Sequence, residues 1–560
     1  MTDSLEPGQD TPESADRTGP RLQGRHDGWV LAGVFIVGLA LRLSTIDTRG
    51  LWLDEAVSID QASRPLSAAI MTQVGGVHPP LFHILMHYWI GAFGSGEVAV
   101  RSFALMFGMA AVLAAYWAGK ELFDSSRVGL LAAGVIAFSP YHIWYAQEAR
   151  MYTMVLLFGL LSVGFLGSAV RRGSPGRWTA YFAVTLLGLF SHYFFAVLVL
   201  GEALYFLVFE VFGRLRALGR DGRRRTRWLR PWRVFSEVPA LGMWLVAMVA
   251  MGGALSAWVT WAVILPQVTA GRGTLIASIT SAGLGYGQLA PSFAVRFNDV
   301  VLVLVEMTAG FHPEPAMFGL VAMWPLVIYL TLLLLGRLEP MRRETVMLVW
   351  CTSGVVLVCA IGQWQGQVLA SRYFMALAAP AGLLVARLID RIPGRGRVAI
   401  VAIGIALALV AWTDQSFDHA NMMRYDDREA IAYVARSYRP GDVIFYEPFY
   451  TDVLFAYYLP KDLVAYDFPQ RGDFGAVRNA KAQIGQDLAR VTASSRRVWL
   501  VLSYQNIDAL RGDTYNTTQW LVRNGFGQRQ HTVLNQVEVL RFDATAQSGQ
   551  VATPTIGGAP

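Results

Sequence analysis

The chain has 560 residues, of which 54% are hydrophobic and only 16% are charged. This composition, gathered into long apolar runs, excludes a soluble globular protein and indicates a chain that crosses the membrane several times. The net charge of +7 comes from basic residues in short stretches between the apolar runs, where they report orientation in the membrane. We therefore expect membrane lipids, and no nucleic acid, among the partners.

The polar first 28 residues are rich in Pro, Gly, Asp and Arg and lack the apolar core of a signal peptide, which predicts a disordered cytoplasmic tail over 1–28. A transmembrane domain is expected over 29–415, with roughly 11 to 13 helices because about 20 apolar residues cross a bilayer. The apolar segments are 29–46, 98–118, 128–145, 151–170, 178–191, 194–212, 238–265, 316–336, 345–362, 373–390 and 398–413.

Arginine placement predicts the orientation. The connection 213–233 holds nine arginines against one acid, Asp221, and is therefore expected in the cytoplasm. Counting alternate connections from there puts the amino terminus inside and everything after residue 414 outside. The outer connections are then 47–97, 142–150, 192–193, 266–315 and 363–372. The apolar stretch 300–311 is expected to lie along the outer surface or to enter the membrane and return.

The character of the chain changes near residue 421. Helical patterns alternate with strand-like runs such as DVIFYE and RRVWLVLSY, separated by Pro-Gly or Asn-Gly turns. This pattern predicts a small extracytoplasmic α/β domain over 421–543, which carries no Gly-rich phosphate loop and no metal-ligand spacing. Residues 544–560 are rich in Gly, Pro, Ala and Thr and are expected to be unstructured.

Two adjacent acids, Asp54 and Glu55 in LWLDEA, follow the first apolar run, and HPPLFH follows them at residues 78–83. Carboxylates beside a histidine at the membrane surface suit chemistry on a lipid-borne phosphate. One alternative is a hydrated helix start, since acids are favourable in a first helical turn. Likewise, the prolines of HPPLFH could simply begin a surface helix, with His78 exposed to water.

A second group of polar residues lies in SPYHIWYAQEARMY, which spans 139–152 between two apolar runs. Helix packing does not require so many polar side chains in one short outer loop. The candidates there are His142, Gln147, Glu148, Arg150 and Tyr152. The alternative for Arg150 is a pair with Glu148 or with an anionic lipid head group.

Two shorter motifs complete the set: SHYF, with His192, and ASRYFM, with Arg372 and Tyr373. His192 could equally be a structural hydrogen-bonding group at a span end, and Arg372 an interfacial anchor. Together with the acids, these residues supply both halves of a displacement reaction. An acid would take a proton from an acceptor hydroxyl while cations and tyrosine hydroxyls hold the departing phosphate.

The order of these motifs, with Glu97 in EVAVRSF between HPPLFH and SPYHIWYAQEARMY, resembles the polyprenyl-phosphate-sugar glycosyltransferases of the GT-C fold. This class includes protein O-mannosyltransferases and the lipid A aminoarabinose transferase. The resemblance covers roughly residues 29–415 and implies a polytopic α-helical GT-C-like membrane protein in a bacterial plasma (inner) membrane. It also implies transfer of a sugar from a polyprenyl-phosphate carrier to an acceptor on the extracytoplasmic face, with inversion.

The same resemblance implies a role for each candidate. Asp54 falls on the usual catalytic base, with Glu55 beside it, and Glu148 would assist or position the acceptor. The donor phosphate would contact the residues His78, Arg150, Arg372 and Tyr373. Weaker candidates for the sugar or the acceptor are His142, Gln147, Tyr152 and His192. His78 stands where some relatives carry Lys, and a histidine is charged only in part near neutral pH.

No cofactor and no metal site are predicted, although relatives differ in whether they need a divalent cation. The expected partners are a polyprenyl-phosphate-linked sugar donor and an acceptor that is a glycan, a lipid or a protein. The rival hypothesis is a transporter or flippase of lipid-linked sugars. Such a protein should show inverted internal symmetry and polar residues near span centres, and the sequence shows neither.

Overall fold

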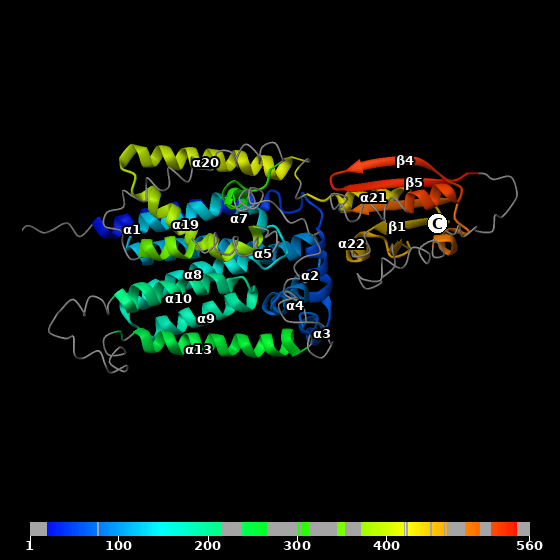
Figure 1. Cartoon of the computed structure of the whole chain (residues 1–560). Coiled ribbons are helices and arrows are strands. Elements are labelled where there is room, and N and C mark those ends of the chain that lie inside the picture. Colours follow the sequence, from blue (N-terminus) through cyan, green and yellow to red (C-terminus); the bar gives the residue numbers. More distant parts are fainter. Residues whose placement is uncertain are drawn as a thin grey trace, which may run out of the picture.

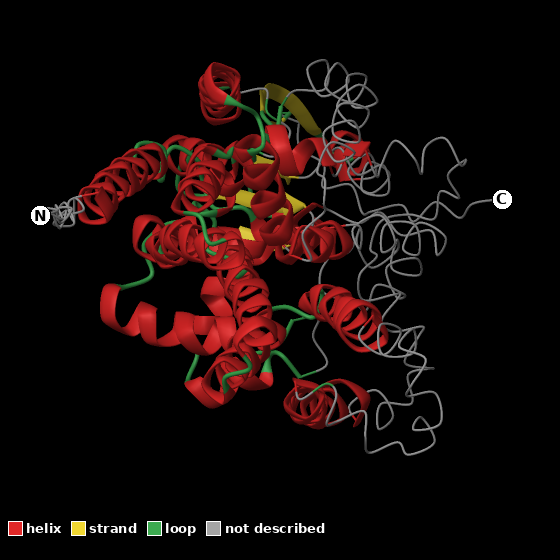
Figure 2. Ribbon diagram, turned by 90° about the vertical axis from the view of Figure 1, so that its left-hand side faces the viewer, coloured by secondary structure: helices red, strands yellow, loops and turns green. Residues whose placement is uncertain are grey.

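The protein is described from a computed structural model (Figure 1). The described residues are 19–74, 78–213, 238, 240–265, 301–302, 304–312, 344–352, 371–418, 421, 424–447, 451–463, 465–467, 488–503 and 517–545. A bundle of long helices forms one part of the molecule, and a small α/β domain lies at one end of it. Seen along the bundle, the helices appear nearly end-on, with strands of the domain behind them (Figure 2).

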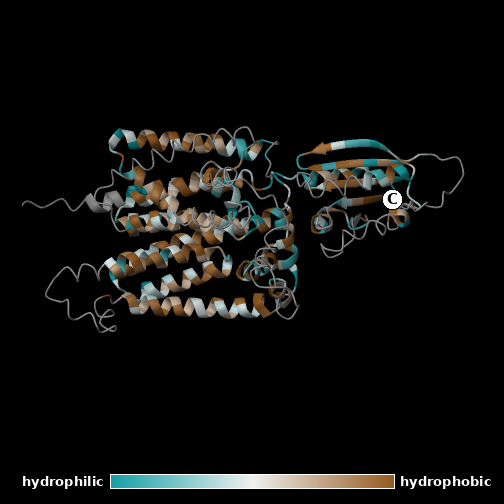
Figure 3. Cartoon of the chain, viewed as in Figure 1, coloured by the Kyte–Doolittle hydropathy of each residue, from teal (hydrophilic) through white to brown (hydrophobic). Residues whose placement is uncertain are grey.

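Within the described residues, seven helices are long and apolar enough to cross a membrane. They are α1 (Gly19–Leu43), α5 (Glu97–Phe123), α8 (Tyr152–Arg172), α10 with η1 (Phe195–Tyr205, Phe206–Phe212), α13 with η3 (Ala240–Val259, Thr260–Ile264), η4 with α19 (Ser371–Phe374, Met375–Asp390) and α20 (Gly394–Phe417). Their residues are mainly hydrophobic along the length of the bundle (Figure 3). The chain is therefore a multi-pass membrane protein. The predicted span 316–336 and most of 345–362 lie outside the described residues.

The predicted single span 128–145 is wrong, because the structure divides it into α6 (Ser126–Phe138) and α7 (Pro140–Tyr145). Ser139 ends α6 and caps α7 by accepting a hydrogen bond from the His142 N–H, and Pro140 occupies the first turn of α7. Arg42 donates to the carbonyls of Ile136 and Ala137 in the last turn of α6 at 3.1 and 2.9 Å. This break turns the chain so that the loop before α8 reaches the site described below.

Three short helices lie at the end of the bundle that faces the α/β domain: α2 (Leu53–Ser63), α3 (Leu66–Met71) and α4 (Leu81–Phe93). Pro65 precedes α3 and Pro80 precedes α4, since proline tolerates a helix start where its missing N–H costs nothing. The predicted span 178–191 is confirmed as a helix, α9 (Pro175–Ser191), which packs beside α8.

The opposite end of the bundle is lined by ion pairs. Glu121 pairs with Arg171, Arg172 and Arg177. Asp390, the last residue of α19, pairs with Arg127, Arg387 and Arg397. The two clusters join helix ends whose basic connections the sequence placed on one side of the membrane.

The α/β domain contains a five-stranded sheet in the order β2-β1-β3-β5-β4. Its elements are α21 (Asp427–Ser437), β1 (Asp442–Glu447), α22 (Asp452–Tyr458), β2 (Ala465–Asp467), β3 (Arg497–Ser503), β4 (Phe526–Leu534) and β5 (Val537–Ala544). Strand β1 pairs in parallel with β2 and β3, whereas β5 is antiparallel to β3 and β4. The predicted small α/β fold is confirmed at this level.

The domain is packed against the bundle. Buried apolar residues of α21 and α22, among them Ile431 and Phe455, belong to one hydrophobic cluster with Leu51 and Ala56 at the start of α2. Burial of such side chains contributes about 1.5 to 3 kcal/mol each, so the contact is more than a loose tether. The domain therefore touches the segment that carries the two adjacent acids.

Candidate active site

Asp54 lies in the first turn of α2, where the chain turns from the segment after α1 into a helix along the end of the bundle. Its side chain is 35% exposed, and one carboxylate oxygen lies 3.8 Å from Nη2 of Arg150. No hydrogen bond from any described residue reaches this carboxylate. The group is therefore held near a cation and is still open to a molecule arriving from outside.

Arg150, from the loop between α7 and α8, is buried beneath Asp54. Its Nη1 donates to the Ser58 hydroxyl at 2.6 Å and to the Asp54 carbonyl at 3.3 Å. Burial opposes its charge, but Tyr152 and Asp54 outweigh burial and raise the pKa of Arg150. Its Nε–H is buried and has no hydrogen-bond partner in the described part of the chain.

Two histidines flank Arg150, and their tautomers follow from their contacts. Nε2 of His78 lies 2.9 Å from Arg150 Nη2, and since a guanidinium only donates, this nitrogen accepts and Nδ1 carries the proton. Nδ1 of His192 accepts from the Phe194 N–H at 3.2 Å, which places its proton on Nε2. Both protonated nitrogens are buried without a partner among the described residues.

Burial lowers the pKa of His78 well below its ordinary value, and the charge of Arg150 adds to the shift. Burial, Arg150 and Arg372 lower the pKa of His192 to about 3. The rings are 5.4 Å apart, and that of His192 also lies 5.9 Å from Tyr373 and 6.4 Å from Tyr152. Both histidines are thus neutral donors in a site whose net local charge is positive.

Arg372 and Tyr373 come from η4, far along the chain, and complete the cluster. The guanidinium of Arg372 lies over Trp52 at 5.2 Å and over Tyr373 at 5.5 Å. No acid of the described residues lies within ion-pair distance of Arg372. Two ring faces contact this guanidinium, and no described residue accepts a hydrogen bond from its side chain, so its N–H groups are available to an anion.

Glu148 is buried in the loop between α7 and α8, two residues before Arg150. One carboxylate oxygen accepts from Trp144 Nε1 at 2.6 Å, and the other is buried without a partner in the described structure. Burial, with the negative charge of Glu55, raises the pKa of Glu148 to about 7. Glu148 can therefore exchange a proton near neutral pH, as a group that assists an acceptor would need to do.

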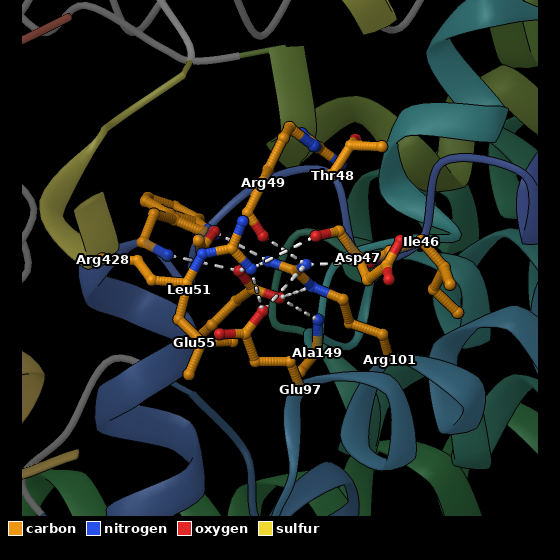
Figure 4. A network of polar contacts seen from close by, with 12 residues as sticks. Ile46, Asp47, Thr48, Arg49, Leu51, Glu55, Glu97, Arg101, Ala149 and Arg428 are labelled. Carbon is orange, nitrogen blue, oxygen red and sulfur yellow. Dashed lines mark hydrogen bonds and ion pairs between the residues drawn. The ribbon is translucent and has the colours of Figure 1, made fainter. Parts of the chain in front are cut away.

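Glu55 occupies a different environment from its neighbour. It is 1% exposed, and its two oxygens accept from Arg101 at 3.0 and 2.9 Å, from the Ala149 N–H at 2.9 Å and from the Trp52 N–H at 3.3 Å. Figure 4 shows the contacts of this carboxylate with Arg101 and Ala149. The expectation that it takes part directly in the chemistry does not fit this geometry, because none of its oxygen atoms is free for a substrate.

Comparison with known proteins bears on the family and the fold. Residues 77–218 match the family profile of the dolichyl-phosphate-mannose-protein mannosyltransferases. No curated protein matches the chain in sequence. The crystal structure of ArnT from Cupriavidus metallidurans in the apo state superposes with a TM-score of 0.55 at 13% identity, covering 92% of this chain and 98% of that one. The same enzyme bound to undecaprenyl phosphate gives 0.56 at 13% identity over the same shares.

The chain has the GT-C fold of membrane glycosyltransferases. Seven of the candidate residues expected from sequence lie together in this fold and form what we call the Asp54 cluster. They are Asp54, His78, Arg150, Tyr152, His192, Arg372 and Tyr373. The matched region 77–218 supplies four of them, whereas Asp54 and the η4 pair lie outside it.

Two further sequence candidates, Gln147 and His142, lie apart from this cluster. The Gln147 side chain donates to the Arg42 carbonyl and to the Thr45 hydroxyl, each at 2.7 Å, and so ties the loop to the end of α1. His142 lies buried in α7, where burial and the charge of Arg42 lower its pKa to about 3. Among the described residues, neither Gln147 nor His142 contacts the Asp54 cluster.

Sequence reasoning missed three residues of the site. Trp52 lies under Arg372, Ser58 accepts from Arg150, and Arg101 holds Glu55. Arg101 carried a usable signal, since a charge within a predicted span marks a special partner. Trp52 and Ser58 had none, because aromatic and hydroxyl residues are common at membrane boundaries. Among the described residues no group of His, Cys, Asp and Glu could hold a metal ion.

The raised pKa of Glu148 predicts how the stability of the folded protein depends on pH. The folded protein keeps this proton up to about pH 7, whereas an unfolded chain loses it near 4.5, so the folded state binds more protons between these values. Stability should therefore fall as pH rises from about 4.5 to 7, with this one group contributing on the order of 3 kcal/mol. Glu148→Gln should remove that contribution.

The measurement is the unfolding temperature of the detergent-purified protein at pH 5 and pH 8. The Glu148→Gln variant should lose less stability over this interval than the unmodified protein. Parallel pH dependences for the two proteins would contradict a proton held by Glu148.

Proposed function

We propose that this protein is an integral membrane glycosyltransferase that moves a sugar from a polyprenyl-phosphate carrier to a hydroxyl or amine acceptor on the extracytoplasmic face. One observation carries the proposal. Three buried N–H donors, on Arg150, His78 and His192, lie in one cluster, and none of them has a hydrogen-bond partner among the described residues. Buried donors are rarely left unpaired, and an anion such as a phosphate would satisfy all three.

In the proposed reaction, the acceptor oxygen or nitrogen attacks the anomeric carbon as the bond from that carbon to the phosphate oxygen breaks. The bonding electron pair stays on the phosphate, whose growing charge is stabilised by Arg150 and Arg372. The acceptor proton passes to the Asp54 carboxylate. One direct attack inverts the configuration at the anomeric carbon and needs no covalent intermediate on the protein.

The donor class is supported by the fit of the cluster to a phosphate and by the fold shared with ArnT, which has been crystallised with undecaprenyl phosphate. Asp54 and its neighbours lie at the end of the bundle next to the α/β domain, which suits a sugar acceptor that arrives from water. We propose that this end faces outward from a plasma membrane and that the amino terminus is cytoplasmic, with the arginine-rich connections inside.

Lipid analysis tests the proposed function. Mass spectrometry of lipids from cells lacking the protein should reveal an accumulated polyprenyl-phosphate-linked sugar. Purified protein in detergent, added to membranes from those cells, should release free polyprenyl phosphate. A transporter or flippase would release none, because detergent abolishes the two compartments it works between, so absence of release would favour that rival and contradict the proposal.

Arg372→Gln should weaken binding of undecaprenyl phosphate about 10-fold or more, because charge-assisted hydrogen bonds to phosphate contribute about 1.5 to 3 kcal/mol. Tryptophan fluorescence can report binding, since Trp52 lies against this guanidinium. Arg64→Gln is the matched control, as Arg64 forms a surface pair with Asp60 in α2. Equal affinities of the two variants would remove Arg372 from the phosphate site.

A further inference from the structure

The segment that leads into Asp54 has an unusual anchor on the side of the bundle. Arg101, in α5, donates to the carbonyls of Ile46 at 2.9 Å, Arg49 at 2.8 Å and Gly50 at 2.9 Å (Figure 4). Its two remaining N–H groups bind Glu55. All five guanidinium donors are thereby used, three on the segment before Asp54 and two on Glu55 after it, so Arg101 fixes the path of the chain there.

The α/β domain holds the same segment from the other side. The Tyr458 hydroxyl in α22 accepts from the Leu51 N–H at 2.6 Å and donates to Glu97 at 2.7 Å. Arg428 in α21 donates to the other Glu97 oxygen at 2.9 Å and to the Asp47 carbonyl at 3.2 Å. Arg424 contributes a further bond of 3.3 Å to the Thr48 carbonyl.

Glu97 connects the two anchors. It accepts from Tyr458 and Arg428 of the domain and lies 3.9 Å from Nη1 of Arg101, one helical turn away in α5. The contact is also close in space, since a Cβ on Gly50 would lie 2.9 Å from the Cβ of Arg428. The domain and the bundle therefore enclose residues 46–51, and Asp54 follows three residues later.

We propose that the α/β domain orders the segment 46–52 and so positions Asp54, with Tyr458 and Arg428 as positioning residues. The inference deepens the proposed function and rests on it for the role of Asp54. It assigns the domain a task other than selecting the sugar acceptor, because these contacts go to the backbone before the proposed base rather than to an open surface.

Adjacent tyrosines provide a matched pair for the test. Tyr457→Phe removes a hydroxyl that donates to the Ser95 carbonyl at 2.9 Å, whereas Tyr458→Phe removes the link between Leu51 and Glu97. Hydrogen exchange of the full-length protein in detergent should show amides 46–52 exchanging about fivefold faster or more in Tyr458→Phe, and unchanged in Tyr457→Phe. Arg428→Gln serves as a second variant if Tyr458→Phe folds poorly.

Turnover gives the second readout, measured as release of polyprenyl phosphate from membranes of cells lacking the protein. The maximal rate should fall about 10-fold in Tyr458→Phe, with the half-saturating amount of membranes changed less than about twofold. Glu97→Gln should lower the rate similarly, and the double variant should add little, because both changes break one path.

Equal exchange in the two tyrosine variants would overturn the inference whatever their activity. A changed half-saturation with an unchanged maximal rate would also overturn it and return the domain to acceptor selection. Faster exchange in Tyr458→Phe, together with full transfer by Asp54→Asn, would support the coupling while refuting the proposed base. The two ideas can thus fail separately.

Discussion

Replacing Asp54 with asparagine should lower the rate of sugar transfer about 10²- to 10⁴-fold, the usual contribution of a general base. The amide keeps the size of the side chain but cannot accept the acceptor proton. The carboxylate is 35% exposed, and its distance of 3.8 Å from Arg150 is too long for a hydrogen bond. Its loss should therefore leave the fold intact. Release of polyprenyl phosphate by the purified variant measures the effect.

Asp60→Asn is the matched control, since Asp60 lies on the same helix in an exposed pair with Arg64. It should transfer sugar within about twofold of the unmodified protein, as surface pairs of this kind contribute about 0 to 1 kcal/mol. Binding of undecaprenyl phosphate should survive in Asp54→Asn. Transfer at an undiminished rate would move the base to another residue, with Glu148 the next candidate.

In contrast to Asp54→Asn, Glu55→Gln should lower the stability of the fold. Removing one partner of a buried ion pair leaves an uncompensated charge and costs about 3 to 5 kcal/mol. Here Arg101 would keep its three backbone carbonyls but lose the negative charge and one of its two side-chain acceptors, because the amide NH₂ of glutamine only donates. We expect a large fall in the unfolding temperature of the detergent-purified protein, measured beside Asp60→Asn as the surface control.

The comparison of Asp54→Asn with Glu55→Gln separates two adjacent acids by role. Asp54→Asn should be stable and inactive, whereas any activity lost in Glu55→Gln should accompany lost stability and faster hydrogen exchange in residues 46–52. A stable but inactive Glu55→Gln protein would instead place Glu55 among the reacting groups. Loss of stability in Asp54→Asn would show that its pairing with Arg150 is structural.

Several candidate residues stood out in the sequence against their surroundings, and the structure brings them together in one cluster. A charged or polar group beside long apolar runs has few structural uses, so Asp54, Arg150 and Arg372 were recognisable although they lie far apart in the chain. The same logic also selected Glu55 and Gln147. Both are polar residues in the same motifs, and only their contacts with Arg101 and with the end of α1 reveal a structural role.

Strand β4 shows another limit. Its sequence, FGQRQHTVL, is largely polar and lacks the apolar run that identified β1 and β3, so no strand was predicted there. It forms the sheet edge, where pairing with β5 supplies its hydrogen bonds. The division at Ser139 was missed for a related reason, because 128–145 reads as one apolar run although Pro140 starts a new helix.

Composition and the long apolar runs determined that this chain is a polytopic membrane protein. The alternation of helical and strand-like patterns after residue 421 determined the α/β domain, and both features follow from local burial of apolar surface. The tertiary structure decided which acid faces the cations and which is enclosed, because neighbouring side chains on a helix point about 100° apart. It also brought Tyr458 and Arg428 against residues 47–51. Contacts between segments so distant in the chain depend on packing, which no local pattern specifies.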